Sequence, residues 1–310
     1  METYRVKLRP LSASLSRWQA DTIFGHLCWA LRYADGEDAL VEFLVTYDAG
    51  RPPLLLSNAF PGDLLPQPAG WPPCPPVDPA AARRDTVARQ LAWHDARRQP
   101  FLTAADFDRA RRGEVLAPTP LPAVPAPERQ RVLFKNQISR RTGTTGGEGQ
   151  LYNVTEFATG YEYLSVYVRV AGDWLDRAQA LFEQVAQGGY GRKKSAGYGQ
   201  FEVVGWEQWE AFATFPEANG FVSLSNFVPA ADDPVAGAYR RLVKYGKLGE
   251  SYTYLPNPFK RPLILLRAGA AFRVARPRPH YGRLVHDIAR QPGVVQYGLA
   301  FDVPARVAVA

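Results

Sequence analysis

One stretch of the chain reads Gln187-Gly188-Gly189-Tyr190-Gly191-Arg192-Lys193-Lys194-Ser195-Ala196-Gly197-Tyr198-Gly199 and combines five glycines, three consecutive cations and two tyrosines. The preceding residues, 173–187, place apolar side chains at helical spacing, with Asp173 as a natural N-cap and Gly188 as a natural C′ residue. The following residues, 200–204, are typical of a strand. Residues 188–199, here called the glycine-rich loop, therefore leave a helix and enter a strand.

The direction of the glycine-rich loop excludes the two common nucleotide-binding loops. P-loops and Rossmann loops run from a strand into a helix, because the helix N-terminus supplies free N–H groups and a favourable dipole. A glycine-rich backbone can instead lie close to a polyanion, and Arg192, Lys193 and Lys194 supply positive charge. The alternative is a solvated loop with ordinary turn glycines. The interleaving of glycines with three cations favours binding of a phosphate backbone.

The composition indicates a globular protein with room for two domains. The chain has 310 residues, of which 46% are hydrophobic and 22% are charged. Its 37 basic and 30 acidic residues give a net charge of +7, which permits RNA or DNA as a partner without identifying one. Cys28 and Cys74 are too few for a zinc cluster, so free thiols are expected. Because neither a signal peptide nor a membrane-spanning run is apparent, we expect a cytoplasmic protein without a membrane partner.

The N-terminal region predicts a strand followed by a helix. Residues 3–9 alternate between apolar side chains and the cations Arg5, Lys7 and Arg9, which is the pattern of a strand with one cationic face. Residues 21–33 repeat apolar side chains at helical spacing, which predicts a helix.

The predicted first helix has a second apolar strip. Asp21 is its expected N-cap, and Gly25, Trp29 and Tyr33 follow one another at intervals of four on the side away from the core stripe. Either another domain or subunit covers this strip, or the helix has one wide apolar face inside a single domain. The sequence favours neither alternative.

The middle of the chain holds an irregular segment and then a second polar loop. Residues 34–131 are proline-dense in two places and predict an insertion, with a short strand at 54–57 and a helix at 87–98. Residues 134–149 are rich in cations, small polar residues and glycine, so they are either an RNA-contacting finger or a surface loop. Two strands, 151–157 and 161–170, then predict a hairpin.

Taken in order, these elements predict a ferredoxin-like, RRM-like βαββαβ unit. Its first and third strands would be central neighbours, so Arg5 and Lys7 would lie beside Tyr163 and Tyr167 on the face away from the helices. This face either binds RNA by stacking and phosphate contact or is covered by a second domain. Residues 211–310 predict a second, degenerate unit, because several strands but no long amphipathic helix stand out there. The predicted fold is α+β, with domains at 1–210 and 211–310.

Several stretches together resemble the RAMP superfamily of CRISPR proteins, and more narrowly the family of subunit four of the type III-A (Csm) interference complex. The glycine-rich loop alone indicates only the superfamily. The further matching stretches, which cover most of the chain in order, are Asp21-Thr22-Ile23-Phe24-Gly25, Ile138-Ser139-Arg140 with Glu148-Gly149-Gln150-Leu151-Tyr152, Asn257-Pro258-Phe259-Lys260-Arg261-Pro262-Leu263, Tyr281-Gly282-Arg283 and Val295-Gln296-Tyr297-Gly298-Leu299-Ala300-Phe301. Residues 34–131 match nothing in this family.

The resemblance implies a non-catalytic, RNA-binding subunit with two ferredoxin-like domains and neither a metal nor another cofactor. Such a subunit holds the repeat-derived 5′ tag of the crRNA and bridges the large polymerase-like Csm subunit and the first backbone Csm subunit, in antiviral defence. The glycine-rich loop would lie against the phosphates of the tag, and the loop at 135–149 would be a thumb-like element on the crRNA.

These expectations assign two sets of residues. The predicted RNA-binding residues are Gly189, Gly191, Arg192, Lys193, Lys194, Ser195, Gly197 and Tyr198 in the glycine-rich loop, and Lys135, Asn136, Arg140, Arg141 and Thr142 before the hairpin. The residues expected to contact either RNA or a partner are Asp21, Thr22, Trp29, Tyr33, Lys260, Arg261, Tyr281 and Arg283.

Two other functions stay open at the level of the sequence. The first is a metal-independent endonuclease that processes precursor crRNA, for which His26 on the first helix is the candidate general acid or base. The second is a protein scaffold that never touches RNA, against which the cationic triplet weighs. No pair of carboxylates has metal-ligand spacing, and no nucleophile motif is present.

Overall fold

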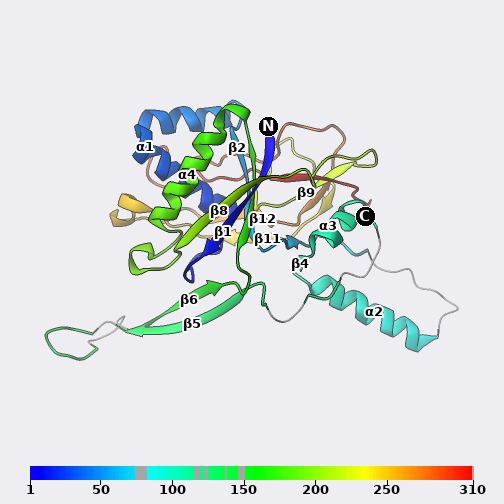
Figure 1. Cartoon of the computed structure of the whole chain (residues 1–310), viewed down its shortest axis with the longest axis horizontal. Coiled ribbons are helices and arrows are strands. Elements are labelled where there is room, and N and C mark those ends of the chain that lie inside the picture. Colours follow the sequence, from blue (N-terminus) through cyan, green and yellow to red (C-terminus); the bar gives the residue numbers. More distant parts are fainter. Residues whose placement is uncertain (74–81, 115–118, 122–124, 137, 146–150, 309–310) are drawn as a thin grey trace.

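The computed structural model describes residues 1–308 except 74–81, 115–118, 122–124, 137 and 146–150. Its main sheet is antiparallel and has the strand order β2-β7-β1-β8. The strands are β1 (Glu2–Pro10), β2 (Leu54–Pro61), β7 (Leu164–Val170) and β8 (Phe201–Gln208). The helices α1 (Ala20–Asp48) and α4 (Leu175–Gly188) lie side by side on one face of this sheet (Figure 1).

The alternation of β1 decides which face the helices cover. Val6 and Leu8 are almost completely buried in the core beneath α1 and α4. As predicted, β1 is central and pairs with β7, with Arg5 opposite Tyr167. The connectivity strand–helix–strand, strand–helix–strand with this order is that of a βαββαβ unit.

The predicted second strand of this unit is wrong. Residues 151–157 lie in β6 (Leu151–Ala158), which pairs with β5 (Arg129–Asn136) and not with the strand that follows it. The second strand is instead β2, which pairs with β7 and has a register irregularity between Leu56 and Ala59. The β5–β6 hairpin is therefore an addition to the main sheet.

The predicted insertion begins later than residue 34. The first helix continues to Asp48 through a kink at Gly36, whose φ of 93° is accessible to glycine but strained for other residues. Because Ala34 to Asp48 and β2 belong to the main unit, the added segment starts after Pro61. The remaining elements of the added segment are β3 (Leu65–Pro66), α2 (Arg83–Arg98), β4 (Phe101–Leu102), α3 (Ala104–Arg111), β5 and β6. The β5–β6 hairpin and α2 protrude in opposite directions from the same side of the molecule (Figure 1).

Two helix caps also differ from the sequence prediction. Helix α1 starts at Ala20, so Asp21 lies in its first turn and Gln19 is the N-cap residue. Helix α4 starts at Leu175 after a short 3₁₀ turn, Gly172–Trp174 (η1), so Asp173 does not cap it. At its other end Gly189, with a φ of 78°, takes the place expected for Gly188.

The second half of the chain is built from short strands. Residues 211–308 are all described and contain no α-helix; one sheet has the order β10-β13-β9-β14, and β11 pairs with β12. The predicted boundary near residue 210 falls between β8 and β9, and the whole chain is α+β. The elements are β9 (Gly220–Ser223), β10 (Gly237–Ala238), β11 (Arg241–Lys244), the 3₁₀ helix η3 (Glu250–Tyr254), β12 (Leu263–Leu266), β13 (Ala271–Arg273) and β14 (Asp302–Ala305).

The second half covers the sheet face on which RNA stacking was one alternative. Tyr167 is fully buried, with its ring centroid 4.8 Å from that of Phe212 and 6.4 Å from that of Phe301. Arg5 is only 9% exposed, and its guanidinium forms ion pairs with Asp63 and Glu207. Around Tyr167 this face is therefore an internal contact between the halves, and the Arg5 side chain pairs with carboxylates of the same chain.

Two further observations concern the environment of the chain. Burial raises the pKa of the Cys28 thiol to about 12, so this free cysteine, partly buried against the core, stays neutral, whereas Cys74 lies outside the described residues. No helix in the described ranges combines the length and apolar character that a membrane crossing requires.

Candidate nucleic-acid interface

Glycines shape the loop that joins α4 to β8. Gly189, Gly191, Gly197 and Gly199 all have positive φ values, between 66° and 84°, which residues with a Cβ adopt at a cost. A Cβ on Gly199 would lie 1.9 Å from the carbonyl oxygen of Tyr190. The glycine content of the loop is thus a requirement of its backbone, with or without a bound ligand.

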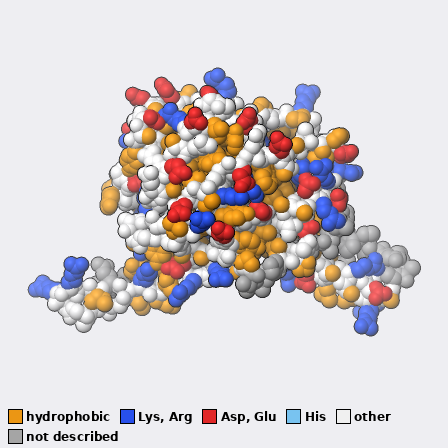
Figure 2. Space-filling view, in the orientation of Figure 1, with side chains coloured by type: hydrophobic (Ala, Val, Ile, Leu, Met, Phe, Trp, Pro, Cys, Tyr) orange, Lys and Arg blue, Asp and Glu red, His pale blue; other side chains and the backbone are white. Residues whose placement is uncertain are grey.

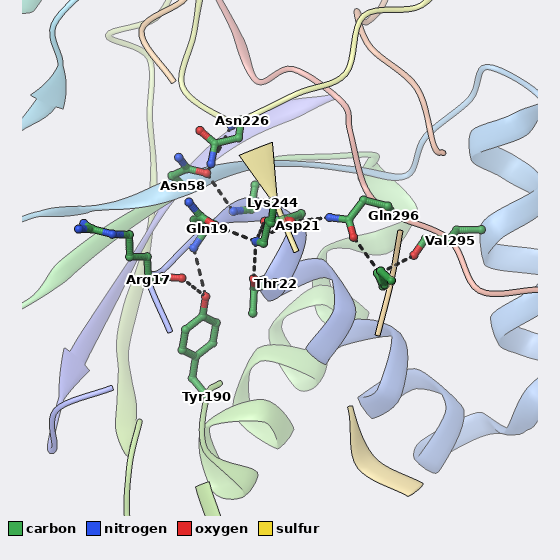
Figure 3. Close-up of polar contacts among 12 residues, drawn as sticks. Arg17, Gln19, Asp21, Thr22, Asn58, Tyr190, Asn226, Lys244, Val295 and Gln296 are labelled. Carbon is green, nitrogen blue, oxygen red and sulfur yellow. Dashed lines mark hydrogen bonds and ion pairs between the residues drawn. The ribbon is translucent and has the colours of Figure 1, made fainter. Parts of the chain in front are cut away.

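Tyr190 fixes the loop to the segment between β1 and α1. Its ring stacks on Trp18 at a centroid distance of 3.9 Å, and the side chain is 1% exposed. Its hydroxyl donates to the carbonyl of Arg17 at 2.7 Å and accepts from the backbone N–H of Gln19 at 3.1 Å (Figure 3). Because burial raises the pKa of Tyr190, the hydroxyl keeps its proton and can make both bonds.

His26 is a second support of the loop. Its Nε2 accepts a hydrogen bond from the backbone N–H of Gly191 at 2.9 Å, so the proton of the neutral ring is on Nδ1. Burial, assisted by Lys194, lowers the pKa of His26 to about 4. A neutral imidazole that accepts the N–H of Gly191 gives this partly buried histidine a structural role in holding the loop.

The three consecutive cations have different surroundings. Lys194 forms an ion pair with Glu250 in the second half of the chain. Lys193 lies over the ring of Tyr152 at 4.5 Å, and its ammonium donates to the Tyr152 hydroxyl at 3.2 Å. Arg192 and Lys193 are exposed, and neither has an ion-pair partner in the described part of the chain. They are the two cations of the triplet that are open to an anion.

The two strands of the β5–β6 hairpin lie against the loop, which the sequence did not predict. Lys135 lies over the ring of Tyr198 at 4.8 Å and donates to its hydroxyl. The Tyr198 hydroxyl in turn donates to Glu156 on β6 at 2.7 Å. Loop and hairpin therefore form one surface with Lys135, Arg192 and Lys193 on it, next to the exposed Ser195 and Gly197.

The other predicted residues of this region lie at the far end of the hairpin. Arg140, Arg141 and Thr142 are exposed in a turn closed by the bridge between Ile138 and Thr145, and Asn136 is exposed at the end of β5. Figure 2 shows cationic side chains on both protruding parts, the hairpin and α2. Of the predicted loop 134–149, residues 137 and 146–149 lie outside the described residues. The structure thus brings Lys135 to the loop but not the cations of the tip.

Asp21, Thr22 and Lys260, three of the residues expected to contact either RNA or a partner, belong to a network of polar contacts within the chain. Lys244 of β11 forms an ion pair with Asp21, 2.6 Å from Nζ to Oδ2, and also donates to Thr22 (Figure 3). Gln296 donates to Asp21 and accepts from Lys260 at 2.8 Å. Burial lowers the pKa of Lys260 to about 8. This network joins the start of α1 to the second half, because Asp21 and Thr22 of α1 bond to Lys244 and Asp21 also bonds to Gln296.

The remaining predicted contact residues divide between core and surface. Tyr281 is 4% exposed and stacks on Phe221, so its side chain belongs to the core of the second half. Arg261 and Arg283 are exposed. On α1, Trp29 packs edge-on against Tyr252 of η3 at 5.3 Å, whereas Tyr33 is 61% exposed. The second strip of α1 is therefore covered partly by the chain itself.

No group of three His, Cys, Asp or Glu side chains in the described residues is arranged to hold a metal ion. The geometry that remains is electrostatic: a rigid, glycine-rich backbone with two open cations, beside a hairpin that adds Lys135. Exposed cations beside a glycine-rich backbone are the kind of surface that suits phosphate groups.

Comparisons with known proteins reveal the fold but no close relative. No family model matches the sequence, and no curated protein matches it. Among solved structures, a chain of the "Csm1-Csm4 cassette in complex with AMPPNP" matches with a TM-score of 0.66 and 18% identity, over 100% of both chains. The chain has the fold of a Csm subunit. A chain of the "Csm3-Csm4 subcomplex in the type III-A CRISPR-Cas interference complex" matches at 0.61 and 12% identity, over 98% of this chain and 99% of that one.

These matches confirm the predicted resemblance at the level of the fold. Because each match covers practically all of both chains, the likeness in fold extends over nearly the whole given sequence. The identities of 18% and 12% explain why sequence comparison alone found no relative.

Proposed function

We propose that this chain is a non-catalytic, RNA-binding subunit of a type III-A CRISPR effector complex. In this role it caps the 5′ repeat-derived tag of the crRNA and bridges the large polymerase-like subunit and the backbone subunit. The division into two ferredoxin-like domains, 1–210 and 211–310, is part of the proposal. The Csm fold over the full chain supports the type of complex, and the crystallised neighbours pair such chains with Csm1 or with Csm3.

The glycine-rich loop is the observation that carries the RNA-binding part. Its backbone is held by Tyr190 and His26 from beneath, so the open cations Arg192 and Lys193 project from a fixed support. A support that is already ordered loses little conformational entropy when an anion binds. Ser195 and Gly197 are small and exposed, and a Cβ on Gly197 would meet nothing within 4 Å, which leaves room for a sugar–phosphate chain to approach.

The position of His26 favours the non-catalytic alternative over the endonuclease. A general base must reach the proton that it removes, but His26 Nε2 is already bonded to Gly191 inside the protein. With a pKa of about 4, its ring would also be a weak base near neutral pH.

Exposed aromatic side chains support the bridging part of the proposal. Tyr33 on α1 is 61% exposed and Tyr254 on η3 is 91% exposed, and these two elements meet where Trp29 packs on Tyr252. Exposed tyrosines are unusually frequent in protein interfaces, because they combine apolar area with a polar hydroxyl. We assign this surface to contact with a neighbouring subunit.

The salt dependence of RNA binding tests the proposal. The pair Arg192→Ala and Lys193→Ala should weaken binding of a single-stranded RNA that carries a CRISPR repeat 5′ tag. Each lost phosphate contact should lower the slope of log affinity against log salt by about 0.7. The matched control is Arg276→Ala with Arg290→Ala, two exposed arginines of the second half. Unchanged affinity and slope in the loop variant would support the scaffold alternative, and cleavage of the RNA in EDTA that depends on His26 would support the endonuclease.

A further inference from the structure

A cleft of about 670 Å³ opens between the base of the β5–β6 hairpin, the earlier part of the added segment and the second half of the chain. This is the size of a typical small-ligand site. Its lining from the hairpin base includes Phe157 and Thr159, from the added segment Gln99 and Phe101, and from the second half Arg267. Three parts that are distant in the sequence therefore meet at one hollow, and nothing in the proposed function uses it.

The wall of the cleft is partly aromatic. Trp18, Phe60, Phe101 and Phe157 line it, and Phe60 and Phe101 meet edge to face with their centroids 6.5 Å apart. The guanidinium carbon of Arg17 lies 4.6 Å from the centroid of Phe157. Aromatic rings and a stacked guanidinium are the surfaces on which unpaired nucleobases stack.

Side-chain amides supply the polar groups of the cleft. Gln67, Gln99, Asn58 and Asn226 all line it. The buried Oε1 of Gln99 has no hydrogen-bond partner in the described part of the protein, and such an orphan acceptor is costly unless a ligand or water satisfies it. An amide offers both a donor and an acceptor, as the edge of a nucleobase does. The unused capacity of Gln99 therefore indicates a polar ligand with a donor group.

The charge of the cleft is positive. Arg17, Arg240 and Arg267 line it, against the single carboxylate of Glu128, with which Arg17 forms an ion pair. Arg240 and Arg267 are exposed and have no carboxylate within ion-pair distance among the described residues. Two open guanidinium groups beside an aromatic wall fit a ligand with both a flat ring and a phosphate.

The cleft shares a wall with the glycine-rich loop. Arg17, Trp18 and Gln19 line the cleft, and the same three residues hold Tyr190 by a hydrogen bond, a ring stack and a second hydrogen bond. The same short segment therefore supports the glycine-rich loop on one side and lines the cleft on the other.

We propose that this cleft binds one unstacked nucleotide of the RNA strand that lies on the glycine-rich loop. The base stacks on the aromatic wall with its edge toward Gln99, and its phosphate contacts Arg240 and Arg267. The proposal rests on the proposed RNA-binding function and adds to it a site for a single nucleobase, built partly from the segment that follows Pro61.

Filling the cleft tests the proposal in the full-length chain. Ala158 is exposed and lines the cleft, so Ala158→Trp should occupy it without disturbing the core. Ala231→Trp, at an exposed position that does not line the cleft, is the matched control. The probes are a single-stranded oligo-adenylate, a set of the same RNA in which each nucleotide in turn lacks its base, and free AMP.

Loss of one stacked base lowers affinity by about tenfold. We expect Ala158→Trp, and an abasic substitution at one RNA position, each to weaken binding by about tenfold, while the two together weaken it no further. Arg240→Gln with Arg267→Gln should weaken binding as well, unlike Arg241→Gln next to it.

The outcomes separate this proposal from the proposed function. If the loop variants weaken RNA binding but neither cleft filling nor any abasic position does, the cleft proposal is wrong and the function stands. If free AMP binds in the cleft and filling the cleft leaves RNA binding unaffected, the ligand is a free nucleotide. The proposal that the cleft binds a nucleotide of the RNA strand is then likewise overturned. Absence of RNA binding by the unmodified chain counts against both.

Discussion

The backbone N–H of Gly191 donates to Nε2 of His26 at 2.9 Å, so a helix residue holds the loop that carries the open cations. His26 is the histidine that the endonuclease alternative required. Its hydrogen bond gives it a structural task that depends on its being neutral, and this task can be tested by pH.

The stability of the protein should therefore fall below neutral pH in a way that depends on His26. Its pKa is lowered from 6.5 to about 4 in the folded state, so the stabilisation is present above pH 6.5 and is lost as the pH falls toward 4. Between pH 7 and pH 5 the loss should be about 2 kcal/mol. Denaturant unfolding at several pH values measures it, and His26→Gln, which keeps an acceptor but does not titrate, should lose less.

Gly199→Ala should destabilise the protein far more than Gly197→Ala. Both glycines have positive φ values, 66° and 84°, so both substitutions incur the left-handed strain of about 1–2 kcal/mol. Only at Gly199 would the new Cβ collide with a backbone atom, the carbonyl oxygen of Tyr190, whereas Gly197 has nothing within 4 Å. Thermal unfolding of the two variants compares them directly, and equal costs would contradict the fixed loop geometry described above.

Removal of Lys244 should be strongly destabilising, because Asp21 would remain as a buried carboxylate without its ion-pair partner. The Asp21 side chain is 2% exposed and that of Lys244 23%. Removing one partner of a buried ion pair lowers the free energy of unfolding by about 3–5 kcal/mol. Lys244→Met should show this cost, and the double variant with Asp21→Asn should recover part of it. A double variant as unstable as the sum of the two single ones would show that the pair is not coupled.

Tyr254→Ala should leave folding unchanged but weaken assembly. At 91% exposure the side chain contributes little to the core, so the free energy of unfolding should change by less than about 0.5 kcal/mol. If η3 and α1 form a subunit contact, co-purification with the large Csm subunit should decrease. Tyr245→Ala, at 73% exposure on another segment, serves as the control, and equal assembly of both variants would argue against this surface.

The sequence predicted the local elements of the main unit but not all of their pairings. Alternation identified β1, and helical spacing identified α4 and the loop that leaves it, because these patterns depend only on neighbouring residues. The nearness of 151–157 to 161–170 suggested a hairpin, whereas β7 pairs with β2, more than a hundred residues earlier. Leu54, Leu55 and Leu56 form a continuous apolar run, which is typical of a buried strand but equally of other buried segments.

The candidate site was predicted where it is made by one segment and missed where distant segments meet. Arg192 and Lys193 are open cations as expected, but the partners of Lys194, Asp21 and Lys260 lie in other parts of the chain. A charged residue at the start of a helix is most often solvated, and only the fold reveals that Lys244 lies beside Asp21. The cleft had no sequence signal, because its wall comes from several separate segments.

The short connection between β1 and α1 has a consequence for how the chain can be cut. Residues 16–22 contact the glycine-rich loop, line the cleft and join the network of Lys244. New termini placed in this connection by circular permutation should therefore abolish all three features together. New termini in the added segment between β3 and α2 should leave the loop and its supports intact, and such a permutant should still bind RNA through Arg192 and Lys193.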